Sequence, residues 1–83
     1  MSIVHTSLSV VLAKFPDHAE KIRRLFRQNS TFQDQCEDYR QCFRALEYWS
    51  QSDTHSAPSR REEYETLLKD LEEEILQTLK ESI

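Results

Sequence analysis

The sequence predicts an all-α protein built around an antiparallel two-helix hairpin with coiled-coil-like packing, preceded by one or two short N-terminal helices. Two apolar stripes carry this prediction, because each advances by steps of three or four residues, as on a helix face that packs against another helix. The first stripe is Phe32, Cys36, Tyr39, Phe43 and Leu46, and the second is Tyr64, Leu68, Leu71, Ile75 and Leu79. The chain also contains no glycine and only two prolines, which leaves few of the residues that tight β-hairpins need.

The whole chain, residues 1–83, is expected to form a single helical domain, and residues 5–29 its N-terminal helical segment with a break near Pro16. Proline disfavours helical geometry at the residue before it but suits the first turn of a following helix. The first helix is indicated by apolar residues at i, i+3, i+4 and i+7, namely Leu8, Val11, Leu12 and Phe15. The second is expected to turn Ala19, Ile22, Leu25 and Phe26 inward and to end near Gln28 or Asn29.

The hairpin itself is expected to comprise a helix over 30–49, a loop over 50–59 and a helix over 60–81. Ser30 with Gln33 and Ser59 with Glu62 match the capping box that often begins a helix. The segment between the two helices is polar, lacks periodicity and contains Pro58, which indicates a loop.

Folding the chain back at this loop predicts a register between the two stripes. The facing pairs expected are Leu46 with Tyr64, Phe43 with Leu68, Tyr39 with Leu71, and Cys36 with Ile75. In the same register Arg40 and Glu72 flank the seam and are expected to form an ion pair worth about 0.2–1 kcal/mol.

The stripes are wider than a two-helix seam needs, so something must cover the surplus apolar surface. The N-terminal helices and a second copy of the chain are both expected to do so, in a dimer that resembles a four-helix bundle; another protein is the alternative partner. For Tyr48 and Trp49 the sequence allows two roles, an exposed anchor for a protein partner or a cap on the hairpin core. The residues expected to form the packing and interface surface are Phe32, Tyr39, Phe43, Leu46, Trp49, Leu68, Leu71, Ile75 and Leu79.

Charge is unevenly placed along the chain. Residues 58–83 carry four Lys/Arg against eight Asp/Glu, which accounts for the whole net charge of −4 and argues against nucleic acid or an anionic membrane as partner of the last helix. A basic cluster nevertheless lies on the Asp17–Gln28 helix and supports the alternative of a nucleic-acid accessory protein, against the simpler reading of a solvated helix face. This cluster is Lys21, Arg23, Arg24 and Arg27.

The sequence shows no arrangement typical of catalysis or metal binding, so we expect no enzyme activity, no cofactor, no metal and no small-molecule substrate. Cys36 and Cys42 lie about 9 Å apart along one helix and on different faces, too far for a disulfide, which favours a reduced, cytoplasmic setting. The histidines His5, His18 and His55 have no spacing typical of zinc ligands. No stretch approaches the ~20 apolar residues that cross a bilayer.

The pattern Phe15–Pro16–Asp17, followed by Lys21–Ile22, Leu25 and Phe32, resembles that of the YdcH-like family of short bacterial proteins, a domain family of unknown function. The resemblance covers His5 to Leu79 and depends most on Phe15–Pro16–Asp17, where the family tends to read Phe-Pro-Glu; Glu72 departs from it, since lysine is usual there. It implies a small cytoplasmic helical hairpin without known catalytic residues. The other residues that carry it are His5, Leu8, Tyr39, Leu46–Glu47 and the segment 71–79.

Overall fold

The computed structural model describes the backbone of residues 3–82 and the side chains of residues 7–82. The predicted all-α class is confirmed, since this part of the chain contains helices and no strand. The elements in order are α1 (Ile3–Lys14), a short 3-10 helix (Pro16–His18), α2 (Ala19–Gln28), α3 (Ser30–Gln51) and α4 (Ala57–Glu81).

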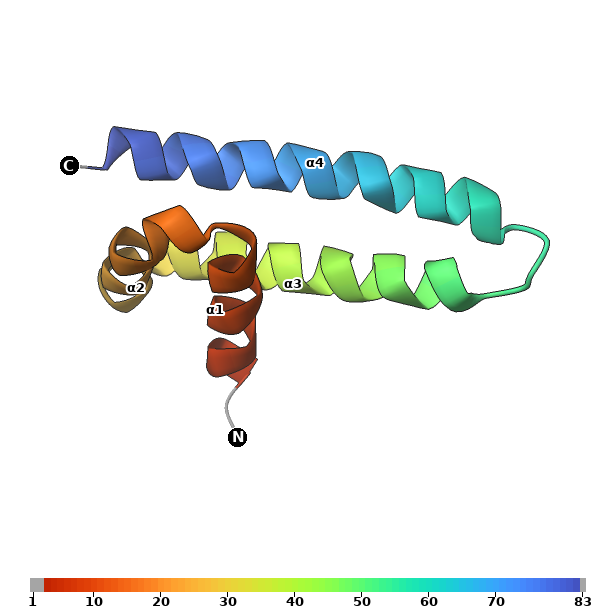
Figure 1. The fold of residues 1–83 in the computed structure, drawn as a ribbon, viewed down its shortest axis with the longest axis horizontal. Coiled ribbons are helices and arrows are strands. Elements are labelled where there is room, and N and C mark those ends of the chain that lie inside the picture. Colours follow the sequence, from red (N-terminus) through yellow and green to blue (C-terminus); the bar gives the residue numbers. More distant parts are fainter. Residues whose placement is uncertain (1–2, 83) are drawn as a thin grey trace.

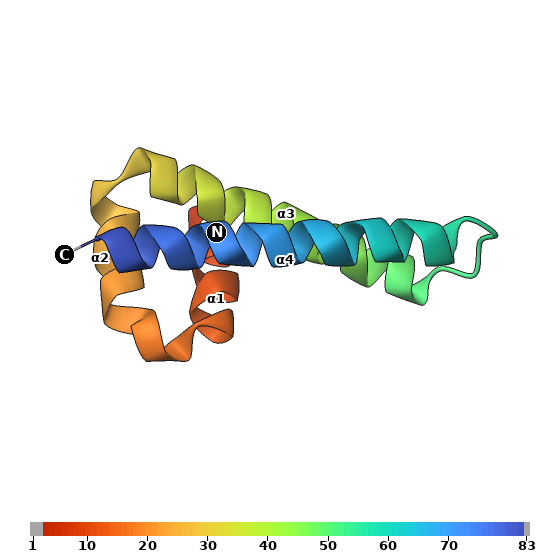
Figure 2. The same cartoon turned by 90° about the horizontal axis from the view of Figure 1, so that it is seen from above.

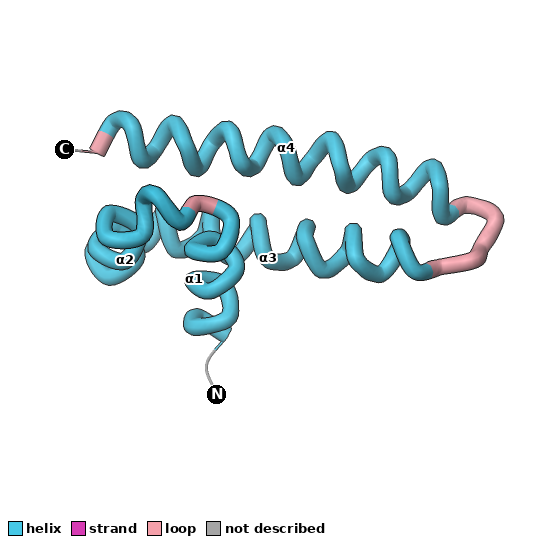
Figure 3. Tube along the Cα trace, in the orientation of Figure 1, coloured by secondary structure: helices cyan, strands magenta, loops and turns pink. Residues whose placement is uncertain are grey.

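The two long helices α3 and α4 lie side by side and run in opposite directions, and the shorter helices gather at one end of the pair (Figures 1 and 2). There α1 stands steeply across α3, and α2 crosses the ends of α3 and α4. The loop at the opposite end is the longest non-helical segment in the described chain (Figure 3). The molecule therefore measures 45 × 29 × 21 Å, with half of the long helix pair projecting from the rest.

Hydrogen bonds at three levels fix the register of α3 against α4. The Cys42 thiol donates to the carbonyl of Tyr64 at 3.5 Å nearest the loop, and the Tyr39 hydroxyl donates to Glu72 at 2.8 Å in the middle. Near the other end the hydroxyl of Thr78 donates to the side chain of Gln35 at 3.1 Å.

The apolar core lies at the end of the pair where all four α-helices meet. Ile22, Phe32 and Ile75 are fully buried there, and burial of each contributes about 1.5–3 kcal/mol. The core consists of Val11, Phe15, Ile22, Leu25, Phe26, Phe32, Cys36, Tyr39, Ile75 and Leu79.

The chain leaves α1 at Phe15, whose φ of −123° and ψ of 64° are not helical. Pro16 follows in the first turn of the 3-10 helix, where its missing N–H removes no helical hydrogen bond. Phe15 itself is buried, so this corner both turns the chain and fills the core.

Helix α3 begins at Ser30 as predicted, but its predicted cap and the predicted start of α4 are wrong. The cap of α3 is Asn29, whose side-chain oxygen accepts from the backbone N–H of Phe32 at 3.0 Å, while Gln33 donates to the carbonyl of Phe26 instead of closing a capping box. Helix α4 begins at Ala57, three residues before the predicted start, because Pro58 fits its first turn. Together with an α3 that reaches Gln51, this shortens the predicted 50–59 loop to residues 52–56.

The predicted Arg40–Glu72 ion pair is also wrong. Arg40 pairs with Glu37 one turn earlier on its own helix, at 2.7 Å. The Glu72 carboxylate is instead taken by the hydroxyl of Tyr39 and by the Lys14 ammonium at 3.5 Å, so it joins α4 to both α3 and α1.

The seam position expected for Phe43 is occupied by Cys42. Cys42 faces α4 and is 4% exposed, whereas Phe43, one residue or about 100° further round the helix, is 36% exposed. The rotation of α3 follows from its having to pack on α1 and α2 as well as on α4, so its apolar stripe is shared among partners.

Candidate protein-interaction surfaces

Most of the distal half of the helix pair, residues 42–71, projects beyond α1 and α2 (Figure 1), although Phe43 at its near end still lines a groove with α1. Only Cys42 and Ala57 are buried in this stretch. The large apolar side chains exposed in the described chain all belong to it: Tyr48 at 64%, Leu67 at 44% and Phe43 at 36%. The distal half therefore has apolar residues in helical register but no core of its own.

The other residues of the predicted packing surface lie either in the core or in the distal half of the helix pair. Phe32, Tyr39, Ile75 and Leu79 are buried in the core. Leu46, Trp49, Leu68 and Leu71 are only partly buried; Leu68 and Leu71 pack against the edge of the core, whereas Leu46 and Trp49 lie farther toward the loop.

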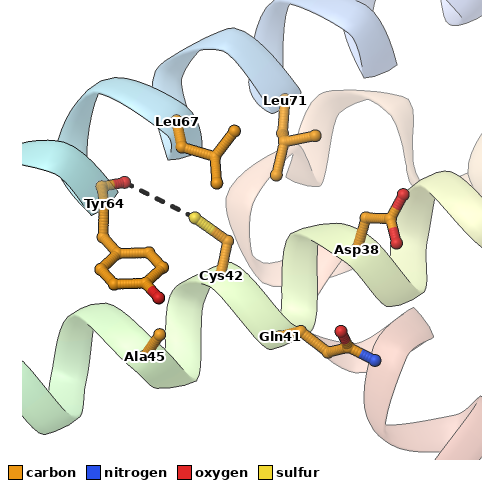
Figure 4. A pocket seen from close by; sticks show the side chains of 7 residues that line it. All are labelled: Asp38, Gln41, Cys42, Ala45, Tyr64, Leu67 and Leu71. Atoms are coloured by element: carbon orange, nitrogen blue, oxygen red, sulfur yellow. Dashed lines mark hydrogen bonds between the residues drawn. The ribbon is translucent and has the colours of Figure 1, made fainter.

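One groove runs between the two long helices on the distal half, and we call it the α3–α4 groove (Figure 4). It has a volume of about 470 Å³ and receives no residue from α1 or α2. Burial raises the pKa of the Cys42 thiol in its floor, so this sulfur is held as a neutral packing group and not as a nucleophile. Its lining is Asp38, Gln41, Cys42 and Ala45 from α3 and Tyr64, Leu67 and Leu71 from α4.

A second groove, the α1–α3 groove, lies in the corner where α1 crosses α3. It has a volume of about 430 Å³ and is mostly apolar, with the phenyl ring of Phe43 at its α3 side. The lining residues are Ser9, Val10, Ala13 and Lys14 from α1, with Tyr39 and Phe43 from α3.

Tyr48 and Trp49 form an edge-to-face pair at the end of α3, with ring centroids 5.0 Å apart and planes at 85°. Tyr48 is exposed and Trp49 is partly buried, so neither belongs to the core cluster. The geometry thus places an aromatic pair at the surface beside the loop.

The predicted basic cluster is divided by the fold. The Lys21 ammonium donates to the carbonyls of Leu79 at 3.0 Å and Ser82 at 2.9 Å, which satisfies the C-terminal end of α4. Lys21 therefore stabilises the fold, a role that the sequence analysis did not predict. Arg23 and Arg27 are exposed and Arg24 is partly buried, and none of these three pairs with a carboxylate among residues 7–82.

A polar network anchors α1 to α3 around Glu37. This carboxylate accepts hydrogen bonds from Ser7 of α1, from Arg40 at 2.7 Å and from Gln41 at 3.0 Å. The Arg40 and Ser7 hydrogen bonds lower the pKa of Glu37 to about 2, because they favour its charged form.

The remaining groups weighed for chemistry lie apart from one another. Burial raises the pKa of the Cys36 thiol to about 12, which makes it unreactive. His18 and His55 are exposed, and the side chain of His5 lies outside the described residues. Across residues 7–82 no three His, Cys, Asp or Glu residues gather as a metal site would require, and no helix described is long and apolar enough to cross a membrane.

The grooves are the features that sequence reasoning missed. Leu67, Ala45 and Asp38 lie beside the predicted stripes, three or four residues from Leu71 or Cys42, so the helical period already placed them next to the seam. No model of a known protein family matches the chain, and no curated protein or solved structure matches it significantly. Membership of the YdcH-like family therefore stays a prediction, and the candidate surfaces depend on this geometry alone.

Proposed function

We propose that this chain is a small non-enzymatic protein-interaction module that self-associates, as a dimer, through the α1–α3 groove. The observation that carries the proposal is the exposure of Phe43 in the middle of α3, beside a groove walled by Val10 and Ala13. An apolar wall of this kind gains free energy when another chain covers it. A cytoplasmic location and a coiled-coil-like bundle in the dimer belong to the same proposal.

The charges around Phe43 favour a second copy as the occupant. The next exposed charges along α3 are Arg44 and Glu47, of opposite sign, and Lys14 lines the groove itself. In a two-fold interface the same patch meets itself, so a patch with both signs can place cations of one copy against carboxylates of the other.

The test is the mass of the protein in solution by sedimentation equilibrium across a range of concentrations. We expect the wild type to dimerise, Phe43→Asp to stay monomeric and Tyr48→Asp to dimerise like the wild type. Tyr48 is a matched control because it is a more exposed aromatic residue on the same helix that lies outside the groove. A wild type that stays monomeric at every concentration, or an equal loss of dimerisation in both variants, contradicts the proposal. Circular dichroism checks that both variants remain helical.

A nucleic-acid accessory role is the second candidate. It is supported by Arg23 and Arg27, which are exposed one turn apart on α2 without a carboxylate partner in the described chain. The loss of Lys21 to the end of α4 reduces this surface, and for that reason we place it second.

A further inference from the structure

We infer that the α3–α4 groove is a docking site for a cationic amphipathic helix of another protein. This inference shares with the proposed function the idea of an interaction module, but it concerns a different face of the molecule. The α3–α4 groove and the α1–α3 groove have no lining residue in common.

The floor of the groove has the shape that a helix requires. Two long helices lie side by side, and Ala45 contributes only a small side chain beneath the ring of Tyr64 (Figure 4). Ridges of side chains on a third helix pack into such a groove. The lining spans Asp38 to Ala45 on α3 and Tyr64 to Leu71 on α4, which is about 10 Å, or two helical turns, at 1.5 Å per residue. A partner helix would fill it with apolar residues at i, i+3, i+4 and i+7.

An extended segment fits this groove less well than a helix. The backbone N–H and C=O groups of both walls are already used within α3 and α4, so they cannot pair with a docked strand. A strand would leave its own polar backbone groups unpaired against Leu67 and Leu71, at a cost that a helix avoids by pairing its backbone internally.

Carboxylates surround the apolar floor. Asp38 lines the groove, and Asp34 precedes it by one turn on α3. On α4, Asp70 and Glu74 lie three and seven residues after Leu67, next to the same face. All four are exposed, and none of their carboxylates has a hydrogen bond or ion pair with another residue in the described range.

This unneutralised rim selects the sign of the partner. Two cations precede the lining residues at the loop end of α4: Arg60, which Glu63 holds at 3.2 Å, and the exposed Arg61, three residues before Tyr64. Lysine or arginine side chains beside the apolar stripe of a docked helix would therefore meet free carboxylates on both sides, and acidic helices would be repelled.

A second copy of this chain does not fit the groove. Two copies placed groove to groove would oppose one acidic rim to another. The basic helix α2 cannot enter either, because its apolar residues Ile22, Leu25 and Phe26 are all buried in the core of its own chain. The occupant must therefore come from another protein.

The experiment is a selection with the full chain against displayed helical peptides that share a fixed leucine stripe and carry either lysine or glutamate at each flanking position. We expect the recovered peptides to be enriched in lysine on both flanks and to bind the purified chain, measured by fluorescence anisotropy. Recovery of no binder, or of binders without a preference for lysine, overturns the inference.

Variants then locate the binding of a recovered peptide. Leu67→Asp should weaken it at least about tenfold, as for loss of a central apolar anchor, and Asp38→Lys with Glu74→Lys should weaken it in a salt-dependent manner. Glu65→Lys with Glu73→Lys makes the same charge change on other faces of α4, outside both grooves, and should leave the affinity unchanged. Equal weakening by the two charge pairs overturns the inference.

The two proposals fail separately in these measurements. Leu67→Asp should weaken peptide binding at least about tenfold and still dimerise, whereas Phe43→Asp should be monomeric and still bind the peptide. A wild type that binds lysine-flanked peptides as a monomer would contradict only the proposed dimer. A dimer that recovers no such peptide would contradict only the docking site.

Discussion

Removal of the Tyr39 hydroxyl is expected to destabilise the fold through a single defined contact. Tyr39 is 1% exposed, and its hydroxyl donates to the carboxylate of Glu72 at 2.8 Å, where the Lys14 ammonium also approaches to 3.5 Å. A hydrogen bond to a charged group contributes about 1.5–3 kcal/mol to folding. Since Glu72 is partly exposed and keeps Lys14 after the substitution, we expect Tyr39→Phe to cost about 1.5 kcal/mol, at the lower end of that range.

The assay is urea unfolding at one fixed protein concentration, because self-association would otherwise contribute to the apparent stability. The loss should appear as a lower midpoint at unchanged slope, and as a melting temperature lowered by about 6–12 °C. Tyr48→Phe is the matched control, since the Tyr48 ring is 64% exposed and has no hydrogen bond from its hydroxyl to a residue in the described chain. A Tyr39→Phe protein as stable as the wild type, or an equal loss in Tyr48→Phe, would refute the reasoning.

Three further perturbations test two other contacts of the fold and the nucleic-acid alternative. Arg40 and its neighbours lower the pKa of Glu37 from 4.5 to about 2, so the stabilising effect of the charged carboxylate should be complete above about pH 5 and lost as the pH falls toward 2. In a plot of the urea midpoint against pH, Glu37→Gln should flatten the curve between these two values. An unchanged curve would count against the Glu37 network. Lys21→Met removes the donor to two carbonyls at the end of α4 and should cost about 1–2 kcal/mol, whereas Arg23→Met should cost nothing measurable. Short single-stranded RNA should bind the wild type no more tightly than Arg23→Glu with Arg27→Glu; a salt-dependent affinity lost on this reversal would favour the nucleic-acid role.

The helical class could be predicted from the sequence because it depends on local patterns. Apolar steps of three and four residues, without glycine, leave little choice but helices, and the described chain is helical at each stripe. Helix ends were less predictable. Asn29 and Ser30 are adjacent and both suit a cap, and the choice between them was decided by Gln33, whose side chain reaches Phe26 on the preceding helix.

The rotation of each helix about its axis could not be predicted from the stripe alone. A stripe of fixed width can face one partner or be divided among several, and α3 divides its stripe among α4, α1 and α2, which turns Phe43 to the surface. The same limit hid the role of Lys21, which joins residues far apart in the sequence, and both grooves, which exist only once two helices lie side by side.

The central claim is that a second copy of the chain covers the α1–α3 groove. Hydrogen exchange measured at low and high protein concentration tests it most directly, because protection reports local opening. The account predicts that amides near Phe43 on α3 and in α1 gain protection as the concentration rises, while those around the buried residues Ile22 and Ile75 do not change. Protection near Phe43 that is identical at both concentrations would contradict it.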